Sequence, residues 1–139
     1  RPYLPLVAAS DASTSCGIGC VVASASLSTV RSLSRLAAKE GDHVVLGEGH
    51  APDTGARCGR RHRLGLDLAA FKTVFCAKKL HDDHINLLEG EAYIGVLKWL
   101  LRSRSRHGAR VPVLVVSKVW LGAAAKGRSS SKPLNRLLR

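Results

Sequence analysis

The sequence lacks methionine and any long apolar run, and it shows no secretory pattern at its first residues. A membrane-spanning helix needs about 20 consecutive apolar residues, so the missing run excludes such a segment from this sequence. A secretory signal would join a basic segment to an apolar one, and the first residues do not. A chain that begins with arginine instead of methionine is interpreted as a fragment or processed piece of a longer protein.

Acidic residues are scarce relative to basic ones, since 10 Asp and Glu stand against 22 Lys and Arg, for a formal net charge of +12. This excess favours a polyanionic partner, with nucleic acid ahead of an anionic membrane. The 139 residues are enough for one domain with a buried core, and no internal repeat divides them. We therefore expect a single basic domain over residues 1–139.

Cysteine pairs with the spacing of metal ligands are absent as well. The four cysteines are Cys16, Cys20, Cys58 and Cys76, and no two of them form a C-x-x-C pair. The nearby histidines follow no zinc-binding spacing either. We therefore predict free thiols in a reducing, intracellular compartment, either cytoplasm or nucleus.

The stretch His84–Arg102 organises the rest of the sequence, and its apolar spacing predicts a helix. At about 100° per residue, one side of this helix is polar and the other is apolar. The polar side contains Glu91, Gly95, Lys98 and Arg102. The apolar side contains Ile85, Leu88, Ala92, Tyr93, Val96, Leu97, Trp99 and Leu100. Gly90 lowers the stability of the same helix by about 1 kcal/mol relative to alanine.

Glu89 lies in the middle of the apolar side of this predicted helix. Burying a carboxylate costs free energy unless a cation, a metal ion or several hydrogen-bond donors pair with it. A structural role also fits the spacing, because Asn86 is placed to cap the helix while Glu89 reaches back to its amide. Glu89 is therefore a candidate metal ligand, a capping residue, or both.

Apolar runs on both sides of this helix predict a sheet. Leu4–Ser10 and Gly19–Ser24 are predicted as two strands that lie alongside each other and are joined by a turn. Lys72–Lys78 is predicted as a third strand, although a helix fits almost as well. Val111–Val116 is continuously apolar, as expected for a strand in the middle of a sheet that is covered on both faces. Asp11 follows the first strand, so it is either a turn residue or a site residue.

The segment between the second and third strands carries a weak signal. Residues 24–71 are predicted as an irregular basic insertion. Within it, Thr29–Lys39 is compatible with a short amphipathic helix, and His50–Arg63 is predicted as a basic loop because it is rich in Gly, Pro and Arg.

The C-terminal segments are predicted as a charged loop, Arg102–Arg110, and two helices. Lys118–Ala125 is predicted as a helix closed by Gly127. A last helix is predicted with Ser131 as a cap and Pro133 in its first turn.

Three local motifs occur in an order that resembles the ribonuclease H fold. They are Ser10-Asp11-Ala12-Ser13 followed by Gly17-x-Gly19, His84-Ile85-Asn86-Leu87-Leu88-Glu89-x-x-Ala92, and Val113–Val119 followed by Leu121-Gly122 and Lys126–Ser131. Together they span nearly the whole chain. The combination resembles the ribonuclease H-like domain of retroelement reverse transcriptases, particularly the tyrosine-recombinase (DIRS-like) kind. The resemblance implies an α/β fold with a mixed central sheet and flanking helices.

The resemblance also implies a chemistry. Ribonuclease H enzymes hydrolyse the RNA strand of an RNA–DNA hybrid with two divalent ions, which clustered carboxylates hold. Asp11 and Glu89 would be the catalytic ligands of Mg²⁺. The residues that would contact the hybrid are Ser13, Asn86, Lys126, Arg128 and Ser129. The rest of a reverse transcriptase polyprotein is the implied partner.

The sequence departs from the family pattern at two of four acids. Val116 occupies the place of the third acid and offers no lone pair to a metal, while the fourth acid, with the last strand and helix of the fold, lies beyond Arg139. The resemblance therefore implies weak or absent Mg²⁺ binding and little or no nuclease activity. We expect the carboxyl groups of Asp11 and Glu89 within about 8 Å of each other. Burial and repulsion should then raise the pKa of Glu89.

Two other classes of function fit the same sequence. One is a structural or interaction protein that retains the fold and carries charge for solubility. The other is a non-catalytic basic module whose binding of RNA or hybrid weakens steeply with salt and needs no magnesium. The residues that would carry this binding are Arg57, Arg60, Arg61, Arg63 and Lys126–Ser131.

Overall fold

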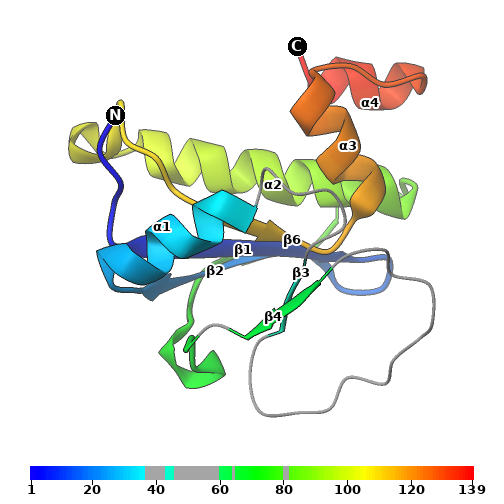
Figure 1. Cartoon of the computed structure of the whole chain (residues 1–139). Helices are drawn as coiled ribbons and strands as arrows, with labels where there is room; N and C mark the ends of the chain where they lie inside the picture. The colour runs from blue at the N-terminus through cyan, green and yellow to red at the C-terminus, as the bar shows by residue number, and fades with distance from the viewer. Residues whose placement is uncertain (37–42, 46–59, 64, 80–81) are drawn as a thin grey trace.

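The computed structural model describes residues 1–36, 43–45, 60–63, 65–79 and 82–139 (Figure 1). These residues form an α/β protein with a mixed four-stranded sheet in the order β5-β2-β1-β6. β1 pairs antiparallel with β2 and parallel with β6, and β5 extends the sheet antiparallel to β2. The strands of this sheet are β1 (Leu6–Ser13), β2 (Gly17–Ser24), β5 (Lys72–Ala77) and β6 (Val113–Val115).

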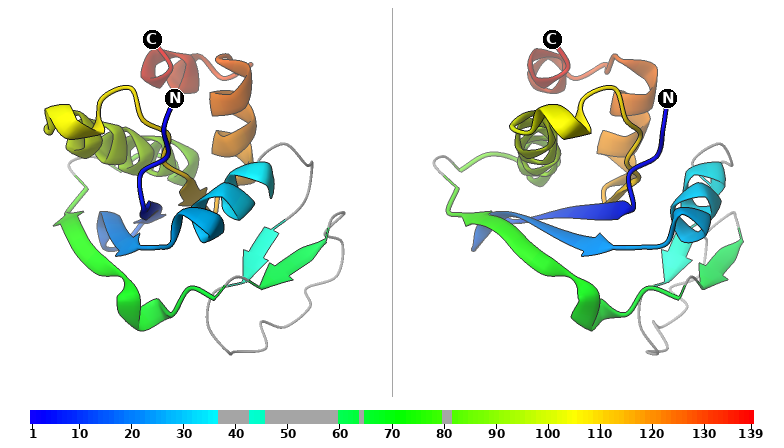
Figure 2. Two further views of the ribbon diagram at one scale, coloured as in Figure 1. Left: turned by 60° about the vertical axis from the view of Figure 1, so that its left-hand side comes forward. Right: turned by 90° about the vertical axis from the view of Figure 1, so that its left-hand side faces the viewer.

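Helices pack on both faces of the sheet. Successive side chains of β1 point to opposite faces, so this strand contributes to both cores. Val7 packs against Val30 and Leu33 on one face, whereas Ala8 packs near Val96 on the other. Figure 2 shows α2, α3 and α4 together on one side of the sheet. The helices are α1 (Leu27–Leu36), α2 (Ile85–Leu101), α3 (Lys118–Lys126) and α4 (Lys132–Leu137).

The hairpin of β1 and β2 confirms two predicted strands but is longer than predicted. Pairing continues to Ser13 and Gly17, so Asp11 lies within β1, opposite Gly19, and the prediction that β1 ends before Asp11 is wrong. Gly17 has a φ of 126°, and a Cβ there would lie 2.1 Å from the carbonyl oxygen of Ala77. The hairpin can therefore end this close to β5 because position 17 is glycine.

Residues 24–71 contain regular elements where the structure describes them, so their assignment as an irregular insertion is corrected. α1 begins two residues before the predicted Thr29, since the Ser26 hydroxyl accepts a hydrogen bond from the Thr29 amide at 3.1 Å. β3 (His43–Val45) and β4 (Arg61–Arg63) form a separate parallel pair, and residues 68–70 form a 3₁₀ turn. The loop prediction is wrong at β4, and residues 50–59 lie outside the described residues.

The central helix α2 is confirmed, but its buried side is rotated from the prediction. Leu97 was predicted to be buried and is 39% exposed. Gly95 was assigned to the polar side and instead faces β5, where a Cβ would lie 2.5 Å from the Phe75 ring. Gly90 likewise leaves room for the Trp120 ring. Gly90 and Gly95 therefore set how closely α2 packs against Trp120 and Phe75, although a glycine contributes nothing to a hydrophobic pattern in the sequence.

β6 is an edge strand in the described sheet, which corrects its predicted central position. It pairs with β1 over three residues and none of them is fully buried. The helix α3 ends as predicted at Gly127, whose φ of 64° is the left-handed cap conformation. Ser131 lies at the N-cap position of α4, but its side chain makes no capping hydrogen bond. No described helix is both long and apolar enough to cross a membrane.

Candidate functional site

Asp11 and Glu89 meet just past the end of β6. The pairing of β6 with β1 ends at Val115 and Ser10, so Asp11 is the first residue of β1 beyond that neighbour. Glu89 lies in the second turn of α2 and is only 6% exposed. Continuing the parallel register by one residue sets Val116 beside Asp11. The sheet register thus relates Val116 to Asp11, and the effect of the Asp11 charge on Glu89 relates Asp11 to α2.

The electrostatics of Glu89 also match the sequence prediction. Burial raises the pKa of the Glu89 carboxyl, and the charge of Asp11 raises it further. A backbone hydrogen bond from Ala12 acts in the opposite direction. The Oε2 atom of Glu89 is buried and has no hydrogen-bond partner among the described residues. Asp11 itself is exposed, and one of its oxygens accepts from the Ala12 amide at 2.9 Å.

The alternative role of Glu89 in a capping box with Asn86 is wrong. His84 is the N-cap residue of α2, and its Nδ1 accepts a hydrogen bond from the Asn86 amide at 3.2 Å. Asn86 is therefore already inside the first turn of the helix. Because His84 satisfies this end of α2, the Glu89 side chain is left to face β1.

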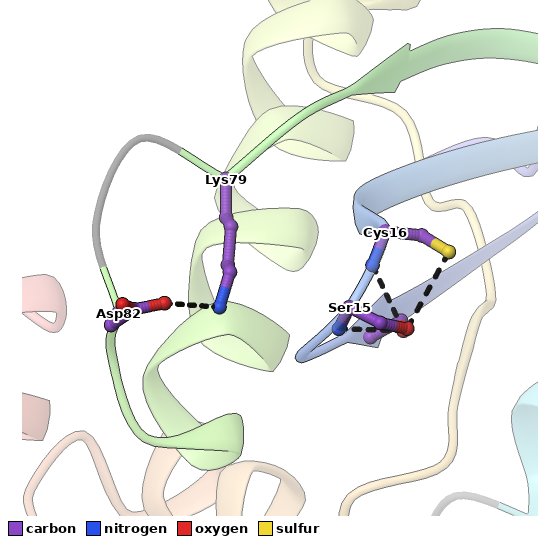
Figure 3. A network of polar contacts seen from close by, with 5 residues as sticks. Ser15, Cys16, Lys79 and Asp82 are labelled. Carbon is purple, nitrogen blue, oxygen red and sulfur yellow. Dashed lines mark hydrogen bonds and ion pairs between the residues drawn. The ribbon is translucent and has the colours of Figure 1, made fainter.

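Ser13 has a structural role in the turn between β1 and β2. Its hydroxyl accepts hydrogen bonds from the amides of Ser15 and Cys16, each at 3.2 Å. Figure 3 shows this turn beside an ion pair of Lys79 with Asp82, which precedes α2. The Lys79 ammonium lowers the pKa of the Asp82 carboxyl.

The predicted phosphate-gripping residues lie at the opposite end of α3. α3 starts two residues after Val116 and is nine residues long, so Lys126 lies about 13 Å along its axis. Lys126 and Arg128 are both exposed. Ser129 is engaged internally, since its amide donates to the Asn135 side chain at 2.7 Å and its hydroxyl accepts from the Ser131 amide. The structure therefore does not bring these residues into the carboxyl pair.

The carboxyl pair offers two carboxylates as oxygen donors, which is fewer than a two-ion site requires. Asp11 offers exposed carboxylate oxygen and Glu89 offers an unpartnered buried one, whereas Val116 offers none. The described residues contain no group of three or more His, Cys, Asp or Glu that could hold a metal ion. Ser10, whose buried hydroxyl also lacks a partner among them, was missed because one serine in an apolar strand carries no distinctive signal.

The cysteines show no metal site within the described residues. Cys16, Cys20 and Cys76 are free thiols there. Cys58 and Arg57 lie outside the described residues. Burial raises the pKa of the Cys20 thiol to about 11, so this cysteine is held in its protonated form at neutral pH.

Comparison with known proteins yields no relative. No protein-family model matches the chain, and neither a curated protein nor a solved structure resembles it significantly. The site must therefore be interpreted from its own residues and geometry.

Proposed function

We propose that this chain is a ribonuclease H-like domain of a retroelement reverse transcriptase polyprotein that binds RNA–DNA hybrid with little or no hydrolysis. The observation that carries the proposal is the Asp11–Glu89 carboxyl pair beyond the end of β6. The order of the main elements supports it, because three sheet strands precede α2 and then β6 and α3 follow. This is the element order on which the resemblance rests.

The loss of hydrolysis follows from the donor count. A two-ion mechanism brings two dications close together, and clustered carboxylates must offset their repulsion. Asp11 and Glu89 supply two carboxylates, and the neighbouring Val116 supplies no oxygen. When one Mg²⁺ ion binds, it would lower the repulsion between the two carboxylates and polarise a nearby phosphate. Asp11 and Glu89 would be the residues that hold this ion at the end of β1.

Binding of the hybrid is attributed to the cationic surface. The net charge of +12 favours contact with phosphates, which release counterions when lysine and arginine neutralise them. Lys126 at the end of α3 and Arg128 on the connection to α4 are both exposed, so they can reach a duplex without rearrangement. A non-catalytic basic module would use the same surface, and it is distinguished by showing no response to magnesium or to changes at Glu89.

The test is binding of a labelled RNA–DNA hybrid by fluorescence anisotropy at 50 and 200 mM salt. We expect affinity to fall steeply with salt and to fall about tenfold in Lys126→Glu/Arg128→Glu. The matched control is Arg31→Glu/Arg35→Glu, which reverses two exposed cations on α1. Equal loss in both variants would contradict the proposed surface.

Magnesium separates the two binding functions in the same assay. If the carboxyl pair lies against the hybrid, Mg²⁺ should strengthen binding in the native chain and less so in Glu89→Gln, because the ion offsets carboxylate–phosphate repulsion. An identical response of both proteins would favour the basic module without a metal site.

A further inference from the structure

A shallow groove separates the C-terminal half of α2 from the edge strand β5. It has a volume of about 170 Å³, and its lining residues are Val74, Phe75, Gly95, Lys98, Trp99 and Arg102. Gly95 allows the Phe75 ring to lie directly against the helix backbone, so aromatic surface reaches the floor of the groove. A groove this small is below the roughly 300–1,000 Å³ of enclosed small-molecule sites. It can accept one planar group from a larger ligand.

Two cations, Lys98 and Arg102, line this groove, and a third, Arg106, lies over the ring of Trp99. Lys98 and Arg102 are one turn apart on α2 and both are exposed. The Arg106 guanidinium lies 3.9 Å from the centre of the Trp99 ring, and its Nη1 donates to the Trp99 carbonyl oxygen at 3.3 Å. The ion pair recorded among the described residues involves none of these three cations. Their charges are therefore available to an anionic ligand.

We propose that this surface, formed by Phe75, Lys98, Trp99, Arg102 and Arg106, binds single-stranded nucleic acid. One base stacks against the aromatic floor, and the adjacent phosphates contact Lys98 and Arg102. The guanidinium stacked on Trp99 extends the flat surface and holds the ring in place. An acidic peptide would satisfy the cations but would leave the aromatic floor without a planar partner.

The surface is separate from both elements of the proposed hybrid site. Lys98 is nine residues after Glu89, which corresponds to about 14 Å along α2. Lys126 and Arg128 lie on another element, at the last residue of α3 and just after it. A strand bound here can thus be recognised whether or not the carboxyl pair binds metal. Loss of hybrid binding and loss of single-strand binding are consequently independent outcomes.

The experiment measures anisotropy of a labelled 20-nucleotide single strand with the full chain and its variants. Lys98→Glu/Arg102→Glu should weaken binding at least tenfold, because two phosphate contacts become repulsive. Arg31→Glu/Arg35→Glu, with the same charge change and the same spacing on α1, should weaken it less than threefold. Hybrid binding through Lys126 should persist in the first variant. Equal losses in both variants would overturn the proposal, because only net charge would then matter.

The fluorescence of Trp99 provides a second measurement, which reports stacking and does not depend on charge alone. This fluorescence should be quenched by the single strand, whereas Trp120 is 1% exposed and should respond little. Trp99→Leu should weaken binding about tenfold, because it removes one aromatic ring from the surface on which the base stacks. Poly-glutamate that quenches Trp99 and competes as well as the single strand would reassign the surface to acidic protein segments.

Discussion

The buried carboxyl of Glu89 lies beside the exposed carboxyl of Asp11 at the end of β1, and burial together with the charge of Asp11 raises the pKa of Glu89. Glu89 reaches this place because His84 satisfies the start of α2. Asp11 is the first residue of β1 beyond the end of its pairing with β6. The site therefore lies where α2 begins and where the pairing of β1 with β6 ends, and it combines side chains that are far apart in sequence.

The raised pKa of Glu89 predicts a pH-dependent stability. Because the folded-state pKa lies above the ordinary value of 4.5, ionisation destabilises the fold as pH rises through the folded-state pKa. Glu89→Gln mimics the protonated form and should be more stable than the native chain at pH 7, with no gain at pH 4. Urea denaturation at the two pH values measures the difference.

Two variants check that this effect belongs to the carboxyl pair. Asp11→Asn removes the nearby charge and should lower the NMR-titrated pKa of Glu89, with burial still holding it above 4.5. Glu91→Gln, which removes one charge two residues further along α2, is the matched control for the change in net charge. A Glu89 that titrates as a free glutamate would contradict the burial and the pairing.

Gly90 is predicted to stabilise the protein despite its low helix propensity. A Cβ at this position would lie 2.8 Å from the Trp120 ring and 2.9 Å from Leu137. Overpacking costs about 1–3 kcal/mol, which exceeds the gain of roughly 1 kcal/mol from alanine in a helix. Gly90→Ala should thus lower the free energy of unfolding by about 1 kcal/mol. Gly122→Ala in α3, where a Cβ would meet nothing within 4 Å, should raise it instead.

Thiol reactivity should follow the burial of the cysteines. Cys20 is buried with a pKa of about 11, so about one molecule in a thousand carries its thiolate at pH 8. Cys16 and Cys76 are exposed. Iodoacetamide labelling with peptide mapping should modify Cys16 and Cys76 first, and Cys20 only in denaturant. Early labelling of Cys20 would show that the contact between α2 and the sheet opens readily.

The elements that sequence predicts well are those with a strong local signal. The strands of the first hairpin have apolar runs, and α3 has both an N-cap, Ser117, and a left-handed closing residue, Gly127. β4 was missed because three residues of alternating Arg and His carry no strand pattern, and its pairing with β3 is a tertiary event. The edge position of β6 was missed because an apolar run shows burial but not the number of neighbouring strands.

The candidate site was only partly predictable for the same reason. Glu89 was identified because helical spacing places its carboxyl group on the apolar side of the predicted helix. Asp11 was indicated by the family resemblance. The cap of α2 was assigned to Asn86 because its spacing to Glu89 matched a known motif, whereas the histidine ring that replaces it is a less common cap. Gly95 escaped notice because a glycine shows its packing role only against its neighbour, Phe75.

If Val116 occupies the place of a lost third carboxylate, an acid introduced there should strengthen metal binding, and this is the most direct test of the proposed site. Val116 is 73% exposed, so Val116→Asp should fold normally. Manganese binding, followed by paramagnetic broadening of the NMR signals of Asp11 and Glu89, should tighten about tenfold or more in this variant. Val119→Asp adds the same charge at a position of α3 that is also exposed and should tighten binding far less. Equal tightening in both variants, or tightening that persists in Val116→Asp/Glu89→Gln, would contradict the proposed site.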